Sequence, residues 1–327
     1  MERMCGQVVE RDVKTGRVDL SKYLVISVWF GCNNDCTICM LSDLKRSLPP
    51  IGFEKFSQVV SDVVEHRRFD NLILSGAEVT TFDDLERYVR FAASFGWFQR
   101  IQIQTNGRRL SDRRYLDRLV ACGVNEFFVS LHGFDEVHDA LTRRPGSFRE
   151  TLAGLRNLEG LTDVNVISNT VLNRTNVHQI AELLHFLSGL RIGELHLWNL
   201  FPMEETDRRD LVVSIREFAR LLPDLLARLK PAGKPIVLKS FPECLAAGSP
   251  AVFDDWFPVT VLPNRFWEEF QRSGFGTCIY RDRCAAAETC WGLSRAYLRK
   301  YGDERDILAP VGRKERPADG RPREAIP

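Results

Sequence analysis

The sequence predicts an α/β protein in which parallel strands alternate with helices. Between residues 23 and 200, six short runs rich in apolar and β-branched residues alternate with segments whose apolar residues recur at helical spacing. Strands that are separated by helices form right-handed βαβ units with all strands in one direction. The chain of 327 residues has room for one full-sized domain and a smaller one.

Each element is predicted from a local signal. The first run, residues 23–30, reads YLVISVWF and is continuously apolar, as in strands that are buried on both faces. The segment after residue 53 repeats apolar residues every three or four positions, and Ser111 is placed to cap a later helix. We expect strands at 23–30, 71–74, 100–104, 126–131, 164–171 and 194–200, and helices at 53–67, 82–95, 111–122, 147–158 and 177–187.

The alternation stops beyond residue 205. There we expect one long amphipathic helix over residues 210–229 and a short strand at 235–239. The residues after Tyr301 are charged and rich in Pro and Gly, which is typical of disorder. The predicted units are an N-terminal cap (1–20), a core barrel (21–205), a C-terminal extension (206–301) and a disordered tail (302–327).

Composition excludes several classes of function. Lys and Arg (45) nearly balance Asp and Glu (44), so the chain has no basic field for nucleic acid. No apolar run reaches the roughly 18–20 residues of a membrane span, and the N-terminus is too charged for a secretory signal peptide. Nine cysteines without such a signal favour metal binding in a reducing compartment. We therefore expect a cytoplasmic protein that binds neither nucleic acid nor membranes.

Three cysteines follow the first predicted strand within eight residues. Cys32, Cys36 and Cys39 are spaced C-x3-C-x2-C on the loop that leaves the carboxyl end of this strand. Three thiolates can hold three corners of an iron–sulfur cube and leave the fourth iron open to another ligand. Structural zinc would need a fourth ligand, for which Asp35 is the candidate inside the loop.

The cysteine spacing, its position after the first strand and the flanking Gly31 resemble the radical S-adenosylmethionine (radical SAM) superfamily; Ile38 departs from the aromatic residue that many members carry. The resemblance implies a partial (β/α)6 TIM-like barrel. It also implies a [4Fe–4S] cluster on Cys32, Cys36 and Cys39, with SAM bound at its open iron. An external electron donor, flavodoxin or ferredoxin, would supply the electron that cleaves SAM to a 5′-deoxyadenosyl radical.

The second predicted strand ends in Ser75-Gly76-Ala77-Glu78-Val79, which looks like the Gly-Gly-Glu-Pro turn of this family. Gly76 and Glu78 match that motif, Ser75 is a small substitute, and Ala77 and Val79 depart from the common pattern. The resemblance implies that Gly76, Ala77 and Glu78 bind SAM, whose amino group would meet the backbone of the turn. An ordinary glycine turn between strand and helix is the alternative.

Later strand ends carry further matches. Asn106 lies in a Thr-Asn-Gly turn, Ser130 would lie near the SAM ribose, and Asn169 is the polar residue that the family often places against SAM on the fifth strand. His132 would contact substrate or serve as a structural hydrogen-bonding residue. Trp198 would stack near adenine or belong to the core.

Other strand-end residues carry two interpretations each. Arg143 and Arg144 could bind a carboxylate or phosphate, or lie on a solvated loop. Phe201, after the sixth strand, would stack near adenine or belong to the core.

Four more cysteines lie in the C-terminal extension: Cys244, Cys278, Cys284 and Cys290. They are enough for a fully ligated second [4Fe–4S] cluster. A cysteine-rich extension of this kind resembles the twitch and SPASM auxiliary-cluster domains, although only the C-x5-C step of the SPASM pattern is kept. A tetrahedral zinc site is the alternative.

These features predict a radical SAM enzyme that abstracts hydrogen from a peptide or amino-acid-derived substrate, with the auxiliary cluster assisting an oxidative modification. The alternatives are a radical SAM enzyme that acts on a small polar metabolite, such as a sugar or nucleoside, and a non-catalytic zinc-binding α/β protein. We see no room at the N-terminus for a peptide-recognition domain. A separate peptide-recognition protein would then supply that function.

Overall fold

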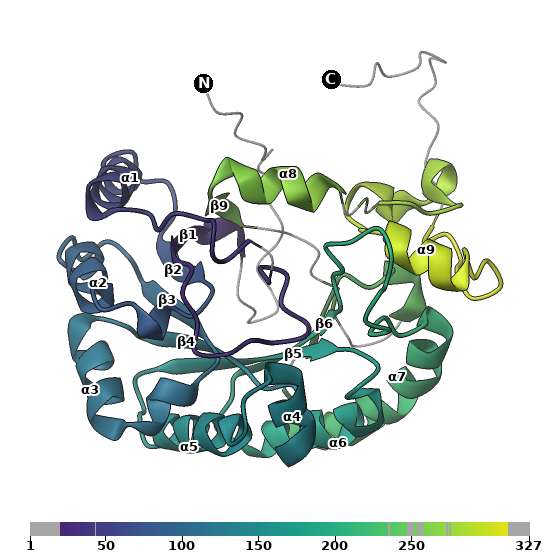
Figure 1. The fold of residues 1–327 in the computed structure, drawn as a ribbon, viewed down its shortest axis with the longest axis horizontal. Coiled ribbons are helices and arrows are strands. Elements are labelled where there is room, and N and C mark those ends of the chain that lie inside the picture. The colour runs from purple at the N-terminus through teal and green to yellow at the C-terminus, as the bar shows by residue number, and fades with distance from the viewer. Residues whose placement is uncertain are drawn as a thin grey trace, which may run out of the picture.

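The computed structural model describes residues 20–42, 44–234, 236–246, 252–253, 258–272, 274 and 276–312. Within them, parallel strands form one sheet in the order β8-β7-β6-β5-β4-β3-β2-β1-β9 (Figure 1). The strands are β1 (Tyr23–Trp29), β2 (Asn71–Gly76), β3 (Arg100–Thr105), β4 (Glu126–Ser130), β5 (Asn165–Leu172), β6 (Glu194–Asn199), β7 (Ile236–Lys239), β8 (Val252–Phe253) and β9 (Val259–Val261).

Helices cover the outer face of the sheet, and Figure 1 shows α1, α2, α3, α5, α6 and α7 around it, with α4 seen between α5 and α6. The α-helices are α1 (Phe53–Glu65), α2 (Leu85–Ala93), α3 (Arg113–Cys122), α4 (Asp135–Thr142), α5 (Ser147–Glu159), α6 (Ile180–Gly189), α7 (Ile215–Leu229), α8 (Asn264–Arg272) and α9 (Arg295–Tyr301). Short 3-10 helices are η1 (Leu20–Lys22), η2 (Val79–Thr81), η3 (Arg108–Ser111), η4 (Val177–Gln179), η5 (Lys230–Ala232), η6 (Glu243–Ala246), η7 (Arg281–Arg283) and η8 (Ala285–Glu288).

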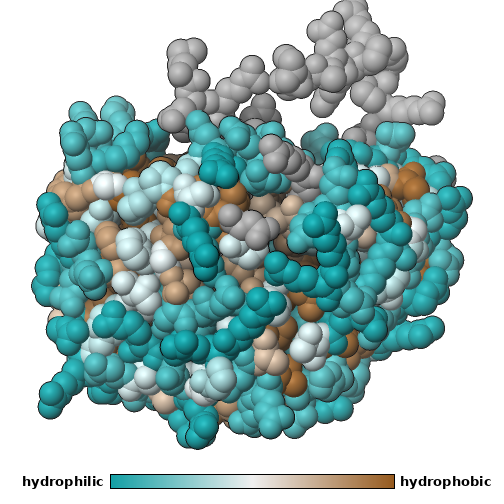
Figure 2. Space-filling model, viewed as in Figure 1, coloured by the Kyte–Doolittle hydropathy of each residue, from teal (hydrophilic) through white to brown (hydrophobic). Residues whose placement is uncertain are grey.

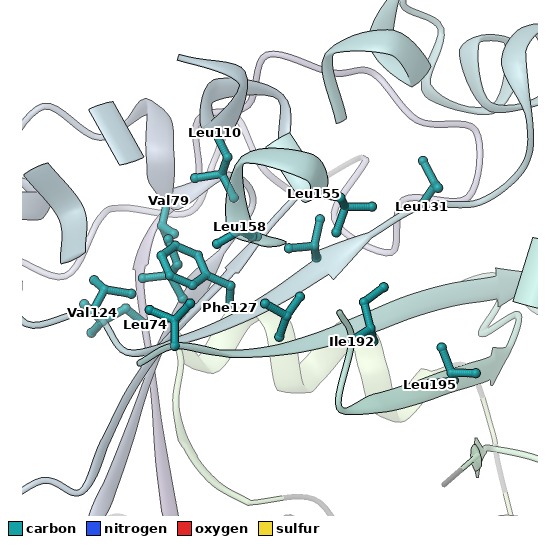
Figure 3. Close-up of a cluster of buried hydrophobic side chains, with 14 of the residues drawn as sticks. Leu74, Val79, Leu110, Val124, Phe127, Leu131, Leu155, Leu158, Ile192 and Leu195 are labelled. Carbon is teal, nitrogen blue, oxygen red and sulfur yellow. The ribbon is translucent and has the colours of Figure 1, made fainter. Parts of the chain in front are cut away.

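The main core lies between the sheet and these helices. Alternate strand residues such as Leu74, Phe127 and Leu195 point toward the helices and pack with Leu110 and Leu155 (Figure 3). Because side chains alternate along a strand, the residues between them face the inside of the curved sheet. The sheet therefore presents an apolar outer face to the helices and a separate inner face.

The prediction of an α/β partial barrel is confirmed. The six predicted strands are β1 to β6, and each is followed by a helix on the outer face. The predicted strand at 235–239 also forms, but β7 joins the core sheet rather than a separate unit. Strand β9, from the C-terminal part of the chain, pairs with β1. In the described residues β8 and β9 are the two sheet edges, so the barrel stays open.

Several local predictions need correction. Helix α4 was not predicted. Helix α7 begins at Ile215 instead of residue 210, because Asp210 has a left-handed φ of 53° that a helix does not contain. The cap of α3 is Asp112, whose carboxylate accepts from the backbone N–H of Arg114, and not Ser111.

The predicted tail begins too early. Residues 302–312 are described, and Leu308 is buried in a cluster with Ile215 and Tyr297. Apolar contacts of this kind hold residues 302–312 against α7 and α9 despite the charged composition around them. Residues 313–327, and residues 1–19 of the predicted N-terminal cap (1–20), lie outside the described residues.

Candidate functional site

The loop that carries the first three cysteines leaves β1 and is held by helix α4. The backbone N–H of Asp35 donates to Thr142 O (3.0 Å) and that of Thr37 donates to Leu141 O (2.8 Å). The last carbonyls of a helix have no partner inside the helix. Helix α4 therefore offers free acceptors at the point where the cysteine loop crosses it.

Residues after β3 hold the other side of the loop. The Arg108 guanidinium donates to Asn33 O (2.7 Å) and Asn34 Oδ1 (2.8 Å), and it pairs with Glu150 at 2.5 Å. The Asn106 side-chain amide donates to Asn33 Oδ1 at 2.7 Å. The loop is thus fixed from two sides by side chains more than 70 residues away in the sequence.

The three thiols lie on one loop, and their mutual charge contributes to the raised pKa values of Cys32 and Cys36. Cys32 Sγ accepts the backbone N–H of Asn34 at 3.3 Å. Desolvation raises the pKa of Cys32 to about 11, although this residue is partly exposed. Burial raises the pKa of Cys36 to about 12, and it also raises the pKa of Cys39. Among the described residues, no three Cys, His, Asp or Glu side chains converge on a site for a single metal ion. The loop thus supplies three thiols as candidate ligands.

The turn after β2 lies against the start of the cysteine loop. The backbone N–H groups of Ala77 and Glu78 donate to Trp29 O (2.8 Å) and Gly31 O (3.0 Å). Gly76 has φ +138°, and a Cβ at this position would lie 1.9 Å from Trp29 O. Glycine is therefore required at residue 76, which explains why this part of the motif is present.

The Glu78 side chain connects the ends of β2 and β3. It is fully buried and accepts from Thr80 N (3.1 Å), Thr80 Oγ1 (2.5 Å), Thr105 Oγ1 (2.6 Å) and Asn106 N (2.6 Å). Burial raises its pKa, and these hydrogen bonds oppose that rise. Glu78 and Asn106 thus use their polar atoms within the protein and position the turns at the cysteine loop.

Ser130 and Asn169 lie side by side on the inner face of the sheet. They are register partners on β4 and β5, and Asn169 is in turn the partner of His196 on β6. Asn169 Oδ1 is buried without a hydrogen-bond partner among the described residues. This row is therefore the part of the predicted site that is free to meet a ligand.

His132 has a structural role. Its backbone N–H donates to His138 Nδ1 (3.1 Å), and its own Nδ1 accepts the N–H of Val171 (3.2 Å). Burial lowers the pKa of His132 to about 3 and that of His138 to about 4. Both rings are therefore neutral near neutral pH, and they tie the end of β4 to α4.

The remaining candidates lie apart from this row. Arg143 is exposed and pairs with the exposed Asp35 at 3.5 Å, as on a solvated loop. Phe201 stacks on Phe270 of α8, with 4.8 Å between ring centroids. Trp198 stays on the inner face next to Phe128.

Sequence reasoning missed Arg108 and Asp139. The Asp139 carboxylate accepts from Gly146 N (2.5 Å), Phe148 N (2.8 Å) and Ser147 Oγ (2.9 Å), so it caps α5 from α4. No local pattern identifies either residue, because their partners come from other elements.

The four C-terminal cysteines line one small cavity. The cavity measures about 20 Å³ and is bounded by Cys244, Cys278, Cys284 and Cys290 together with Leu293 and Leu308. Three of the sulfurs accept backbone N–H groups: Cys278 from Tyr280 (3.5 Å), Cys284 from Val311 (3.3 Å) and Cys290 from Gly292 (3.4 Å). The structure thus brings together cysteines that lie up to 46 positions apart in the sequence.

A second cavity, of about 210 Å³, lies between the first cysteine loop, the segment after β6 and helix α8. Cys39 and Met40 line one side, and charged residues of both signs line the other, among them Glu204, Arg209 and Arg265. In the space-filling view, hydrophilic residues surround smaller hydrophobic patches (Figure 2). No helix in the described part of the chain is long and apolar enough to cross a membrane.

Comparison with known proteins places these features in context. Residues 26–187 match the family model of the Radical SAM superfamily. The probable GTP 3′,8-cyclase of Sulfurisphaera tokodaii is 28% identical over 188 residues, which are 55% of this chain and 56% of that protein. The mycofactocin maturase MftC of Mycobacterium tuberculosis is 28% identical over 256 residues, which are 74% of this chain and 64% of that protein. The matches thus span less than two thirds of these relatives.

The fold is similar to that of Streptococcus suis SuiB bound to its precursor peptide SuiA. The TM-score is 0.58 at 13% sequence identity, and the similarity covers 90% of this chain and 75% of SuiB. At this identity the similarity concerns the fold alone, and it extends through the barrel into the C-terminal segment.

Proposed function

Because the chain belongs to the radical SAM superfamily, we propose that it is an oxidative peptide-modifying enzyme with two iron–sulfur clusters. Cys32, Cys36 and Cys39 would hold the first [4Fe–4S] cluster. When bound, that cluster supplies the electron that cleaves SAM and so provides the radical that abstracts hydrogen from the substrate. The main support is the pair of cysteine sites, three thiols on one loop and four around one cavity.

The residues at the first site fit a [4Fe–4S] cluster that binds SAM. The loop supplies three thiols and no fourth cysteine, which leaves one iron open for SAM. The backbone of Gly76 and Ala77, which lies against Trp29 and Gly31, would accept hydrogen bonds from the amino group of SAM. Ser130 and the unpartnered Asn169 Oδ1 would face the rest of SAM from β4 and β5.

The residues at the second site fit an auxiliary [4Fe–4S] cluster better than zinc. Zinc needs sulfurs about 3.8 Å apart, since Zn–S bonds are about 2.3 Å long at tetrahedral angles. The four cysteines share a cavity but form no single-ion site among the described residues. Backbone N–H bonds to three of the sulfurs are also typical of cluster ligands, whose potential they tune.

The substrate that the chain favours is a peptide or an amino-acid derivative. The cavity beside Cys39 carries acidic as well as basic side chains, and its Asp207 already pairs with Lys300. A site for a nucleoside triphosphate would instead be lined mainly by cationic side chains that bind the phosphates. SuiB is a protein of similar fold that binds a precursor peptide. A separate peptide-recognition protein and a flavodoxin or ferredoxin would complete the system.

A nucleotide substrate is the second candidate. It is supported by the similarity to the probable GTP 3′,8-cyclase over 188 residues. A sugar or another small polar metabolite belongs to the same alternative.

The proposal is tested by anaerobic purification and cluster reconstitution, followed by the addition of SAM and dithionite. We expect about eight irons per chain, for two four-iron clusters, and release of 5′-deoxyadenosine. About four irons with the same product would assign the C-terminal cysteines to another group. Zinc in place of iron, with no release of 5′-deoxyadenosine, would contradict the proposed enzymatic function.

A further inference from the structure

Strand β6 places a carboxylate–imidazole pair on the inner face of the sheet. Its residues Leu195 and Leu197 point into the outer core, so Glu194, His196 and Trp198 face inward. His196 Nε2 lies 3.0 Å from Glu194 Oε2, and each residue is 6% exposed. The pair is thus buried beside the row that contains Ser130 and Asn169.

The pair leaves one ring nitrogen free. A carboxylate only accepts hydrogen bonds, so Nε2 carries the hydrogen that it shares with Glu194, and Nδ1 keeps its lone pair. His196 Nδ1 is buried, and among the described residues it has no hydrogen-bond partner. The same holds for Trp198 Nε1, which is a donor. One acceptor and one donor are therefore presented on the same face, two residues apart.

Neighbouring rings keep this arrangement rigid. Phe128 of β4 contacts the His196 ring edge-on, with centroids 5.3 Å apart, and lies 6.0 Å from the Trp198 ring. Lys239 of β7 lies over Trp198, with Nζ 5.2 Å from the ring centroid. Glu194 on the same strand thus contacts His196, and Lys239 on the next strand contacts Trp198.

We propose that His196, held by Glu194, is the base that accepts a proton from the reacting residue of the substrate. An oxidative modification removes two hydrogens, and at least one leaves as a proton that a base must accept. In this step the X–H bond of a substrate hydroxyl, thiol or ammonium group breaks, its electron pair stays on X, and the proton binds His196 Nδ1. Glu194 holds the ring through Nε2 while Nδ1 takes the proton. Trp198 Nε1 donates a hydrogen bond to the same substrate residue.

The inference rests on the proposed function, and it defines the substrate as one with an acidic hydrogen next to the reacting carbon.

The first test is the tautomer of His196. In reconstituted protein labelled with 15N-histidine, we expect the His196 ring to carry its hydrogen on Nε2 near neutral pH, and an E194Q variant serves to assign the signal. A hydrogen on Nδ1 would overturn the proposal, because that atom could then accept nothing. This measurement needs no substrate.

The second test is kinetic and uses defined probes. They are N-acetylated, C-amidated pentapeptides with Cys, Ser, Thr, Tyr or Lys at the centre, the same peptide with Ala, and GTP. We expect 5′-deoxyadenosine formation to rise with at least one of the first group and not with the Ala peptide. H196N keeps an acceptor atom but no base, so kcat for that peptide falls about 100-fold while KM changes by less than about threefold.

The matched control is H178N, the same substitution at an exposed histidine of η4. It should leave both constants unchanged. Equal behaviour of H196N and H178N, or stimulation by the Ala peptide or by GTP alone, would overturn the proposal. Failure of the proposed function is distinguishable, since no 5′-deoxyadenosine would then form under any condition.

Discussion

The two cysteine sites differ in how far apart their members lie in the sequence. The first takes three cysteines from eight consecutive residues, whereas the second collects four between residues 244 and 290. The first loop is fixed by side chains and carbonyls from the β3 end and from α4. The second lies among short 3-10 helices and one isolated bridge, Thr277 with Leu293.

This difference separates two ways of building a metal site. A short spacing places the thiols close together before folding, and the fold then only orients the loop. A dispersed set exists only after η6, η7 and the segment before α9 have come together. We therefore expect the second site to depend on the bound group for its order more than the first does.

The largest expected effect is on iron content and SAM cleavage. C36A should bring the iron content from about eight to about four per chain and abolish 5′-deoxyadenosine formation, because the open iron is lost. C284A should lose about four irons as well but keep measurable 5′-deoxyadenosine formation. C122A, which removes a buried thiol outside both sites, is the control. A C284A variant that keeps all its iron would show that the four C-terminal cysteines do not hold a cluster.

The next effect is on stability, and it compares a glycine at each site. In G76A the new Cβ meets Trp29 O at 1.9 Å with φ at +138°, and we expect a loss of about 3–5 kcal/mol in the free energy of unfolding. In G292A the Cβ lies 2.8 Å from Thr277 O with φ at +61°, and we expect about 1–2 kcal/mol. Guanidinium unfolding measures both. Equal losses would mean that the first loop is no more tightly docked than the second.

The third effect is on acid stability, and it belongs to the first site alone. His132 and His138 have pKa values of about 3 and about 4 in the fold, below the ordinary 6.5. Below pH 6.5 the unfolded chain binds protons that the folded chain does not, so stability falls with pH. The loss is about 2 kcal/mol per histidine at pH 5.

H138N separates this contribution from other titrating groups. The Asn oxygen can accept the His132 N–H in place of Nδ1, and the variant should lose about 2 kcal/mol less than wild type between pH 7 and pH 5. Unfolding curves at the two pH values provide the measurement. An unchanged difference would show that His138 is protonated in the fold.

The sequence predicted what local patterns contain. The β1 to β6 strands lie in short runs rich in apolar and β-branched residues, and Cys32, Cys36 and Cys39 lie on one loop, so both were predictable. Helix α4 was missed because eight residues are too few for a clear helical period. Strands β8 and β9, with two and three residues, carry no signal of their own and form only through pairing with β7 and β1.

Within the site, the predicted motif residues have different tasks. Glu78 matches the turn motif, but its partners Thr105 and Asn106 come from the next strand, so its structural role depends on tertiary contacts. The Glu194–His196 pair carries no motif. Its significance follows from strand alternation, which became clear only when the inner face of the sheet was known.

The position of β9 bears on the order of folding. Strand β1, which leads into the first cysteine loop, lies between β2 and β9, and Leu24 pairs with Val259. Closing a loop of this length costs about 5 kcal/mol in chain entropy, and such non-local pairings form slowly. During synthesis the strand beside the first cysteines thus stays an open edge until residue 259 leaves the ribosome. The loop can accept iron before that moment, but its strand is flanked on both sides only afterwards.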